Sequence, residues 1–201
     1  MRWQLKAEDI ISTAVYSVVY FIVVALSAMV CVFILPIIFP FLTYPYLYIP
    51  VLSALFSGTI YMLLAARVQK FGAVSLMALL MGIFFLFVFP YAFFVSLLVG
   101  VAADLVAAAG RYKSKGGLLL SYLVFSLHLL GPVLPMFLFP DLYRDQLERL
   151  GRDAGQIAET LSVAEPGQGF LLAGLTLLAA LIGGWFGQKM LAKHFKKAGI
   201  V

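Results

Sequence analysis

The chain has 201 residues, of which 64% are hydrophobic and 11% charged, and its formal net charge is +5. Soluble domains carry about 25% charged residues, so this composition excludes an ordinary soluble domain and predicts an integral membrane protein. The length leaves no room for a separate catalytic or nucleotide-binding domain. We therefore expect residues 1–201 to form a single membrane domain.

Long apolar runs predict the membrane spans, since about 18 or more apolar residues are typical of a transmembrane helix. Residues 71–109 are too long for one span, because a helix of that length would extend about 58 Å against a hydrocarbon core of about 30 Å. Pro90 lies near the midpoint and predicts a turn there. We expect an all-α membrane protein with six transmembrane helices, near residues 10–34, 48–66, 73–89, 91–109, 118–138 and 170–190.

The basic residues predict the orientation, because short cytoplasmic loops are rich in Lys and Arg. With both termini inside, only Arg144, Arg149 and Arg152 fall on the outer side. The eleven inner basic residues are Arg2, Lys6, Arg67, Lys70, Arg111, Lys113, Lys115, Lys189, Lys193, Lys196 and Lys197. We expect a multi-pass protein of a bacterial plasma membrane with both termini cytoplasmic. Its net charge reflects topology and an anionic inner leaflet, not binding of nucleic acid.

The sequence lacks the motifs of an ATPase or an enzyme. It contains no G-x-x-x-x-G-K-[ST] and no H-E-x-x-H, and Ser126 and His128, two residues apart on one helix, do not face each other. We therefore expect no catalysis and no intrinsic cofactor or metal. Asp104 is the only acid in a predicted span, and we expect a structural anion near residues 111–115 rather than a proton carrier. A partner would then supply the energy.

Aromatic residues gather on the predicted outer side. Residues 36–50 contain four prolines, which should keep this connector non-helical, and five aromatic residues; residues 84–94 add more Phe and Tyr. An interfacial belt explains some of them, but a belt should be two-sided. We therefore favour an aromatic-walled outer pocket for a flat, largely apolar ligand. The candidate residues from these segments are Tyr44, Tyr48, Phe85 and Tyr91.

Residues 141–163 predict an amphipathic helix on the outer surface, between the fifth and sixth spans. Its apolar residues recur at steps of three and four, and Gly151 and Gly155 weaken it. It is either a passive connector or a cap over the pocket. Gly183 and Gly184, in the last span, predict close helix packing.

His128 lies in the proline-containing fifth span, where a polar side chain is costly enough to suggest function. The alternative is a histidine that forms a hydrogen bond to a neighbouring helix. Met136 lies two turns further on, and imidazole and thioether both bind heme iron. Heme is thus a candidate ligand, with Arg144 or its neighbours on the outer segment binding the propionates. The competing ligand is a small water-soluble vitamin or precursor, bound through Tyr hydroxyls and His128.

Several segments resemble those of a known family, and the resemblance extends over nearly the whole chain. These segments are residues 67–74, 100–105, 111–115, 121–127 and 183–201. The sequence resembles the MptD or Trep_Strep family, regarded as S components of energy-coupling factor (ECF) transporters, a class of ABC importer. The resemblance implies a six-helix subunit that binds a micronutrient outside and docks on one transmembrane coupling subunit and two ATPase subunits. It also implies that the subunit topples in the membrane to release its cargo inside.

Docking residues follow from the same resemblance. Many S components dock through an alanine-x-x-x-alanine motif in the first helix. The nearest equivalents here are Thr13, Ala14 and Ser17, all small enough for close helix approach. A structural or assembly membrane protein is the alternative of a different class.

Overall fold

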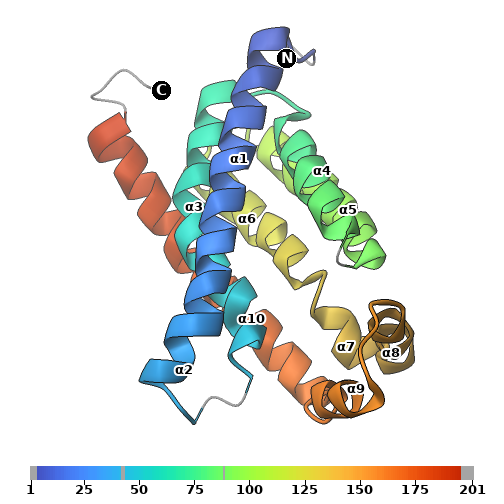
Figure 1. Cartoon of the computed structure of the whole chain (residues 1–201). Coiled ribbons are helices and arrows are strands. Elements are labelled where there is room, and N and C mark those ends of the chain that lie inside the picture. The colour runs from blue at the N-terminus through green and yellow to red at the C-terminus, as the bar shows by residue number, and fades with distance from the viewer. Residues whose placement is uncertain (1–3, 42–43, 88, 196–201) are drawn as a thin grey trace.

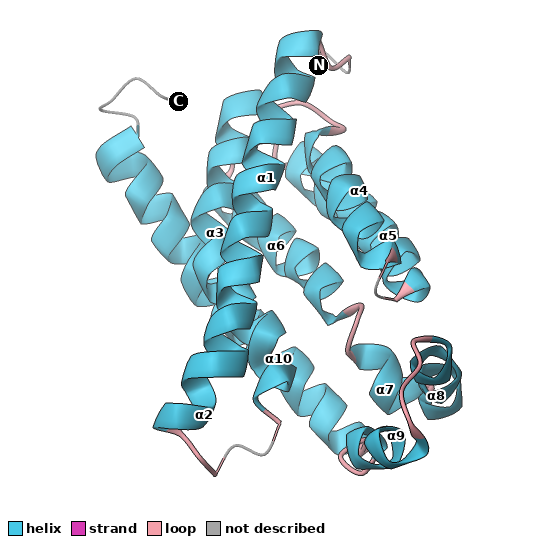
Figure 2. Cartoon of the chain, in the orientation of Figure 1, coloured by secondary structure: helices cyan, strands magenta, loops and turns pink. Residues whose placement is uncertain are grey.

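The computed structural model describes residues 4–41, 44–87 and 89–195, without the side chains of residues 166, 194 and 195. Within these ranges the chain forms helices joined by turns and loops, and no strand (Figure 2). The expected all-α fold class is confirmed. Arg2, Lys196 and Lys197, which contribute to the expected basic side, lie outside the described residues.

Four helical segments of the described chain are long and apolar enough to cross a membrane: residues 7–38, 45–68, 90–109 and 167–193. Two shorter apolar helices cover residues 73–86 and 115–130. All six segments belong to one bundle and run alternately up and down, so that the first and last long helices have their terminal ends on the same side (Figure 1).

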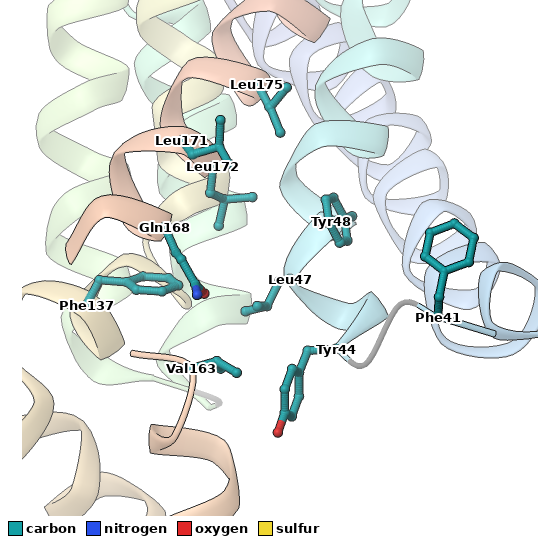
Figure 3. Close-up of a pocket in the computed structure, with 10 residues that line it drawn as sticks. All are labelled: Phe41, Tyr44, Leu47, Tyr48, Phe137, Val163, Gln168, Leu171, Leu172 and Leu175. Carbon is teal, nitrogen blue, oxygen red and sulfur yellow. The ribbon is translucent and has the colours of Figure 1, made fainter. Parts of the chain in front are cut away.

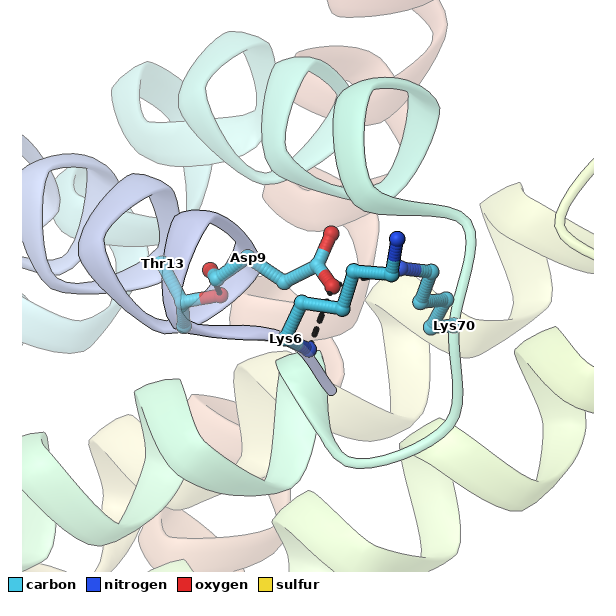
Figure 4. Close-up of polar contacts among 4 residues, drawn as sticks. All are labelled: Lys6, Asp9, Thr13 and Lys70. Atoms are coloured by element: carbon cyan, nitrogen blue, oxygen red, sulfur yellow. Dashed lines mark hydrogen bonds and ion pairs between the residues drawn. The ribbon is translucent and has the colours of Figure 1, made fainter. Parts of the chain in front are cut away.

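The first span begins with α1 (Ala7–Met29), and it continues through the short π-helix η1 (Val30–Ile34) into α2 (Leu35–Ile38). The Asp9 carboxylate accepts a hydrogen bond from the Lys6 backbone N–H at 2.7 Å (Figure 4) and pairs with Lys70 Nζ at 2.5 Å. This ion pair joins the start of α1 to the turn that follows the next span.

The connector after α1 is partly helical, so the expectation that its prolines keep it non-helical is wrong. Pro36 lies inside α2, and Pro45 begins the 3-10 turn η2 (Pro45–Tyr48). Proline is compatible with a first helical turn, because the backbone donor that it lacks would have no partner there.

Glycines bring the second and last spans together. The helix α3 (Ile49–Val68) packs along α10 (Pro166–Met190). A short π-helix, η4 (Leu191–Phe195), follows α10. A Cβ atom on Gly183 would lie 2.7 Å from the Ala54 carbonyl oxygen, and one on Gly58 would lie 2.7 Å from the Gly184 backbone nitrogen. Only glycine allows this approach, which confirms the expected close packing.

A short hairpin forms the third and fourth segments. Its helices are α4 (Ala73–Leu86) and α5 (Pro90–Ala109), and Pro90 is the first residue of α5, so the turn lies where the sequence predicts it. At the base of the hairpin, the Asp104 carboxylate accepts hydrogen bonds from the Gly72 backbone N–H at 2.7 Å, the Ser75 hydroxyl at 2.8 Å and the Tyr112 hydroxyl at 2.5 Å. Asp104 therefore joins the start of α4 to the turn after α5 through hydrogen bonds.

The fifth segment, expected near residues 118–138 as a helix kinked by its prolines, is interrupted in the half that carries them. It consists of α6 (Lys115–Ser126), the 3-10 turn η3 (Leu127–Leu130) and α7 (Leu134–Leu138), with a turn at residues 131–133. Pro132 lacks a backbone donor and cannot continue the helix after η3, whereas Pro135 lies in the first turn of α7, where proline is compatible with a helix. The chain therefore bends between η3 and α7.

The amphipathic segment, which we expected on the outer surface, forms two helices rather than a single one: α8 (Pro140–Arg149) and α9 (Ala154–Leu161). Gly151 separates them with a φ of 76°, a left-handed conformation that favours glycine. Tyr143, Leu147 and Ile157 are buried, as the expected apolar face requires.

Candidate ligand-binding site

Two hollows open at the end of the bundle that holds α2, α8 and α9, opposite the turns that carry most of the basic residues. The first has a volume of about 440 Å³. Figure 3 shows residues of the α1–α3 connector on one side of it and residues of α7 and α10 on the other. Its lining is Phe41, Tyr44, Leu47, Tyr48, Phe137, Val163, Gln168, Leu171, Leu172 and Leu175.

The second hollow lies between the connector and the α8–α9 segment and has a volume of about 510 Å³. Both charged and amide side chains contribute to it. Its lining is Tyr44, Tyr46, Phe89, Tyr143, Leu147, Leu150, Arg152, Gln156, Glu159 and Thr160. Tyr44 belongs to both linings, so the two hollows adjoin at this side chain.

The α8–α9 segment packs against the bundle through aromatic contacts. Tyr143 stacks on Phe89 with ring centroids 4.9 Å apart and an interplanar angle of 12°. Burial raises the pKa of Tyr143 to about 12, so its hydroxyl stays protonated at neutral pH and can donate a hydrogen bond. Because the segment supplies one wall of the second hollow, its geometry supports a cap more than a passive connector.

The residues singled out from the sequence fall into three groups. Tyr44 and Tyr48 line the first hollow. Phe85, His128 and Met136 are buried in the core of the bundle. Tyr91 on α5 is half-buried and Arg144 on α8 is exposed, and neither belongs to the lining of these two hollows. Only the connector tyrosines are therefore brought to the site.

His128 lies in an aromatic environment inside the bundle. Its ring centroid is 4.5 Å from that of Phe125, 5.7 Å from that of Tyr20 and 6.1 Å from that of Phe85. Nδ1 donates to the Phe125 carbonyl oxygen at 2.6 Å, because a carbonyl can only accept. Nε2 then carries the lone pair, and it has no hydrogen-bond partner among the described residues. The contact to the carbonyl is within the same segment, not to a neighbouring helix as the sequence alternative supposed.

Several lining residues were not identified from the sequence. Most of them are as apolar as lipid-facing residues, so their residue types do not distinguish a ligand-binding position from a lipid-facing one. These are Phe137, Leu171, Leu172 and Leu175. Gln168 is different, because an amide at the start of an apolar helix is a recognisable polar position. The contact between α7, α10 and the connector is a long-range property of the fold.

The small residues of α1 that were expected to dock on a partner lie on different faces. Thr13 is 0% exposed and Ser17 is 3% exposed, and their hydroxyls donate to the Asp9 and Thr13 carbonyl oxygens. Ala14 is half-buried. Beside it, Val15 is 57% exposed and Val18 is 59% exposed, so these side chains form the outward surface of α1.

Comparison with known proteins identifies one relationship. Residues 7–197 match a family described as a hypothetical bacterial integral membrane protein (Trep_Strep). No curated protein and no solved structure matches the chain significantly.

Proposed function

The chain belongs to the Trep_Strep family of bacterial integral membrane proteins, and we propose that it is the substrate-binding S component of an ECF-type importer. It captures a micronutrient outside the cell and delivers it with a transmembrane coupling subunit and two ATPase subunits. The observation that carries this proposal is the pair of aromatic-walled hollows at one end of a helix bundle. The chain itself does not hydrolyse ATP.

The topology that we propose has six spans, with both termini and the basic turns in the cytoplasm. In support, the two shorter apolar helices lie within the same bundle and alternate in direction with the four longer ones. Basic residues of the described chain occur at the turns of one end, and the acidic α8–α9 segment lies at the other. Lys- and Arg-rich turns favour the cytoplasmic side.

The ligand class that fits the hollows best is a flat, largely apolar micronutrient with a polar or anionic group. Tyr44, Tyr48 and Phe137 offer ring faces and edges in the first hollow. The Gln168 amide can bind a polar substituent there, and Arg152 at the second hollow can bind a carboxylate. Few polar groups in an apolar hollow are typical of ligand pockets.

Heme is the sharpest candidate of this class, and His128 is its candidate iron ligand. The unpartnered Nε2, with Nδ1 fixed by a backbone carbonyl, is the arrangement that metal-binding imidazoles adopt. His128 and Met136 lie in the core rather than in the linings of the outer hollows, so iron ligation requires the bundle to open around η3. A small water-soluble vitamin, held by tyrosine hydroxyls without such opening, is the second candidate.

Mass spectrometry and an absorption spectrum of the purified protein test the ligand. A Soret band that is lost in His128→Ala supports heme ligation, whereas a colourless protein that retains a vitamin and fails to bind added heme refutes it. Tyr44→Ala and Tyr48→Ala should weaken binding of either ligand. Tyr91→Ala is the matched control, because Tyr91 lies outside both linings.

Proteoliposomes test the transport role. Vesicles that contain only this chain should accumulate no ligand, and addition of the coupling subunit, the ATPases and ATP should restore uptake. Gradient-driven uptake by the chain alone would overturn the proposal. A structural or assembly protein would purify without ATPases and would bind no small molecule.

A further inference from the structure

A third hollow lies at the opposite end of the bundle, where α3, α6 and α10 end or begin. Its volume is about 370 Å³. Five of its lining residues are apolar, and the others are polar or basic residues of the adjoining turns and helix ends. The lining is Met62, Ala66, Gln69, Tyr112, Lys113, Lys115, Leu118, Gln188, Leu191 and Ala192.

The positive charge at this hollow is not neutralised by its own lining. Lys113 and Lys115 are both exposed, and the lining contains no carboxylate. Asp104 contacts Tyr112, but it is fully buried and accepts hydrogen bonds from Gly72 and Ser75 as well. Neither lysine forms an ion pair within the part of the chain that the structure describes, so both are available to an anion.

An interfacial anchor on α10 places the hollow at the edge of the apolar bundle. Trp185 is 52% exposed, and Lys189 Nζ lies 3.6 Å from the centroid of its ring. Exposed tryptophans concentrate where the bilayer meets water. On the same turn, the Gln188 side chain lines the hollow and donates to the Lys115 carbonyl oxygen at 2.7 Å. The basic rim and the hydrocarbon boundary therefore lie at the same level of α10.

We infer that this hollow binds the phosphate headgroup of an anionic phospholipid. Basic pockets between transmembrane helices on the cytoplasmic side suit such headgroups. Lys113 and Lys115 bind the phosphate, while Met62, Leu118 and Leu191 contact the apolar part of the lipid. These apolar walls distinguish a lipid from a free phosphate, which would use only the rim. The site is separate from the outer hollows, so it does not depend on the identity of the transported ligand.

Trp185 provides a direct readout, because the chain contains two tryptophans and Trp3→Phe leaves Trp185 as the sole fluorophore. The protein is reconstituted in phosphatidylcholine vesicles that contain either brominated phosphatidylglycerol or brominated phosphatidylcholine. We expect stronger quenching by the brominated anionic lipid. Because each lysine near an anionic headgroup contributes about fivefold to the affinity, Lys113→Gln/Lys115→Gln should abolish most of this preference.

The matched control is Lys6→Gln/Lys193→Gln, which removes the same charge from exposed residues outside the lining. It should keep the preference for the anionic lipid. Equal loss in both double variants would show a general surface-charge effect and overturn the site. Inorganic phosphate, added at constant ionic strength, should leave the quenching unchanged; full competition by it would assign the site to free phosphate instead. Gel filtration of the single variant Lys113→Gln checks folding, because a folded variant should elute as one monodisperse peak. Weaker quenching by the brominated anionic lipid in that folded variant then reports loss of binding rather than loss of folding.

Discussion

The Tyr44 hydroxyl lies 3.3 Å from the Ser162 hydroxyl, although the two residues are 118 positions apart in the sequence. This contact joins the α1–α3 connector to the end of α9. It lies where the two hollows of the candidate site adjoin, because Tyr44 lines both. One polar contact therefore couples the connector to the α8–α9 segment, and it joins a half-buried residue to an exposed one.

The first prediction concerns this coupling. Tyr44→Phe removes this hydrogen bond, whose net contribution is about 0.5–1.5 kcal/mol, and should increase hydrogen exchange in residues 154–164. Ser162→Ala also removes the hydrogen bond from the Ser162 hydroxyl to the Glu159 carbonyl oxygen, so it should increase the exchange further. The double variant should exchange no faster than Ser162→Ala alone, because that variant already removes the contact to Tyr44. Additive effects would show that the two hydroxyls act independently.

The second prediction concerns helix packing. Gly183→Ala should destabilise the protein by about 1–3 kcal/mol, because its Cβ atom would meet the α3 backbone and force α10 away. Gly174→Ala is the control on the same helix, since its Cβ atom would have no heavy atom within 4 Å. Thermal unfolding in detergent compares the two variants. Equal melting temperatures would contradict the packing argument.

The third prediction concerns Asp104. Asp104→Asn should lower stability by about 1–3 kcal/mol, because the amide has one carbonyl oxygen and cannot accept the whole set of hydrogen bonds from Gly72, Ser75 and Tyr112. Asp145→Asn, on the exposed face of α8, is the control. Asp104→Asn protein that remains folded should bind the ligand as the wild type does. Loss of ligand binding without loss of folding would assign Asp104 a functional role instead.

The fourth prediction concerns topology. In a Cys31→Ala background, which removes the only native cysteine, Lys113→Cys and Asp145→Cys place one thiol at each end of the bundle. A membrane-impermeant maleimide should label Asp145→Cys in intact cells and Lys113→Cys only after permeabilisation. The reverse pattern would place the basic turns outside.

The fifth prediction concerns the docking surface. Val18→Trp should weaken co-purification of the coupling subunit and ATPases while ligand binding is retained, because Val18 is exposed beside Ala14 on α1. Leu178→Trp, at an exposed position of α10, is the control. Ser17→Trp should instead impair folding, since Ser17 is buried in the bundle. Unchanged co-purification of Val18→Trp would remove this face from the interface.

The sequence by itself determined the features that depend on local chemistry. Apolar composition specifies an all-α membrane protein, Pro90 specifies the turn between α4 and α5, and Gly183 specifies a close helix approach. These predictions succeed because hydrophobicity, proline geometry and the absence of a Cβ atom act within a few residues.

The tertiary structure decided which aromatic residues form the site. Tyr44 and Tyr48 reach the first hollow, whereas Phe85 is buried in the core and Tyr91 lies outside both linings. Phe137 joins the lining because the chain bends between η3 and α7 and brings α7 against the start of α10. An apolar side chain has the same composition whether it faces lipid, core or ligand. Only the packing of helices distant in sequence distinguishes these environments.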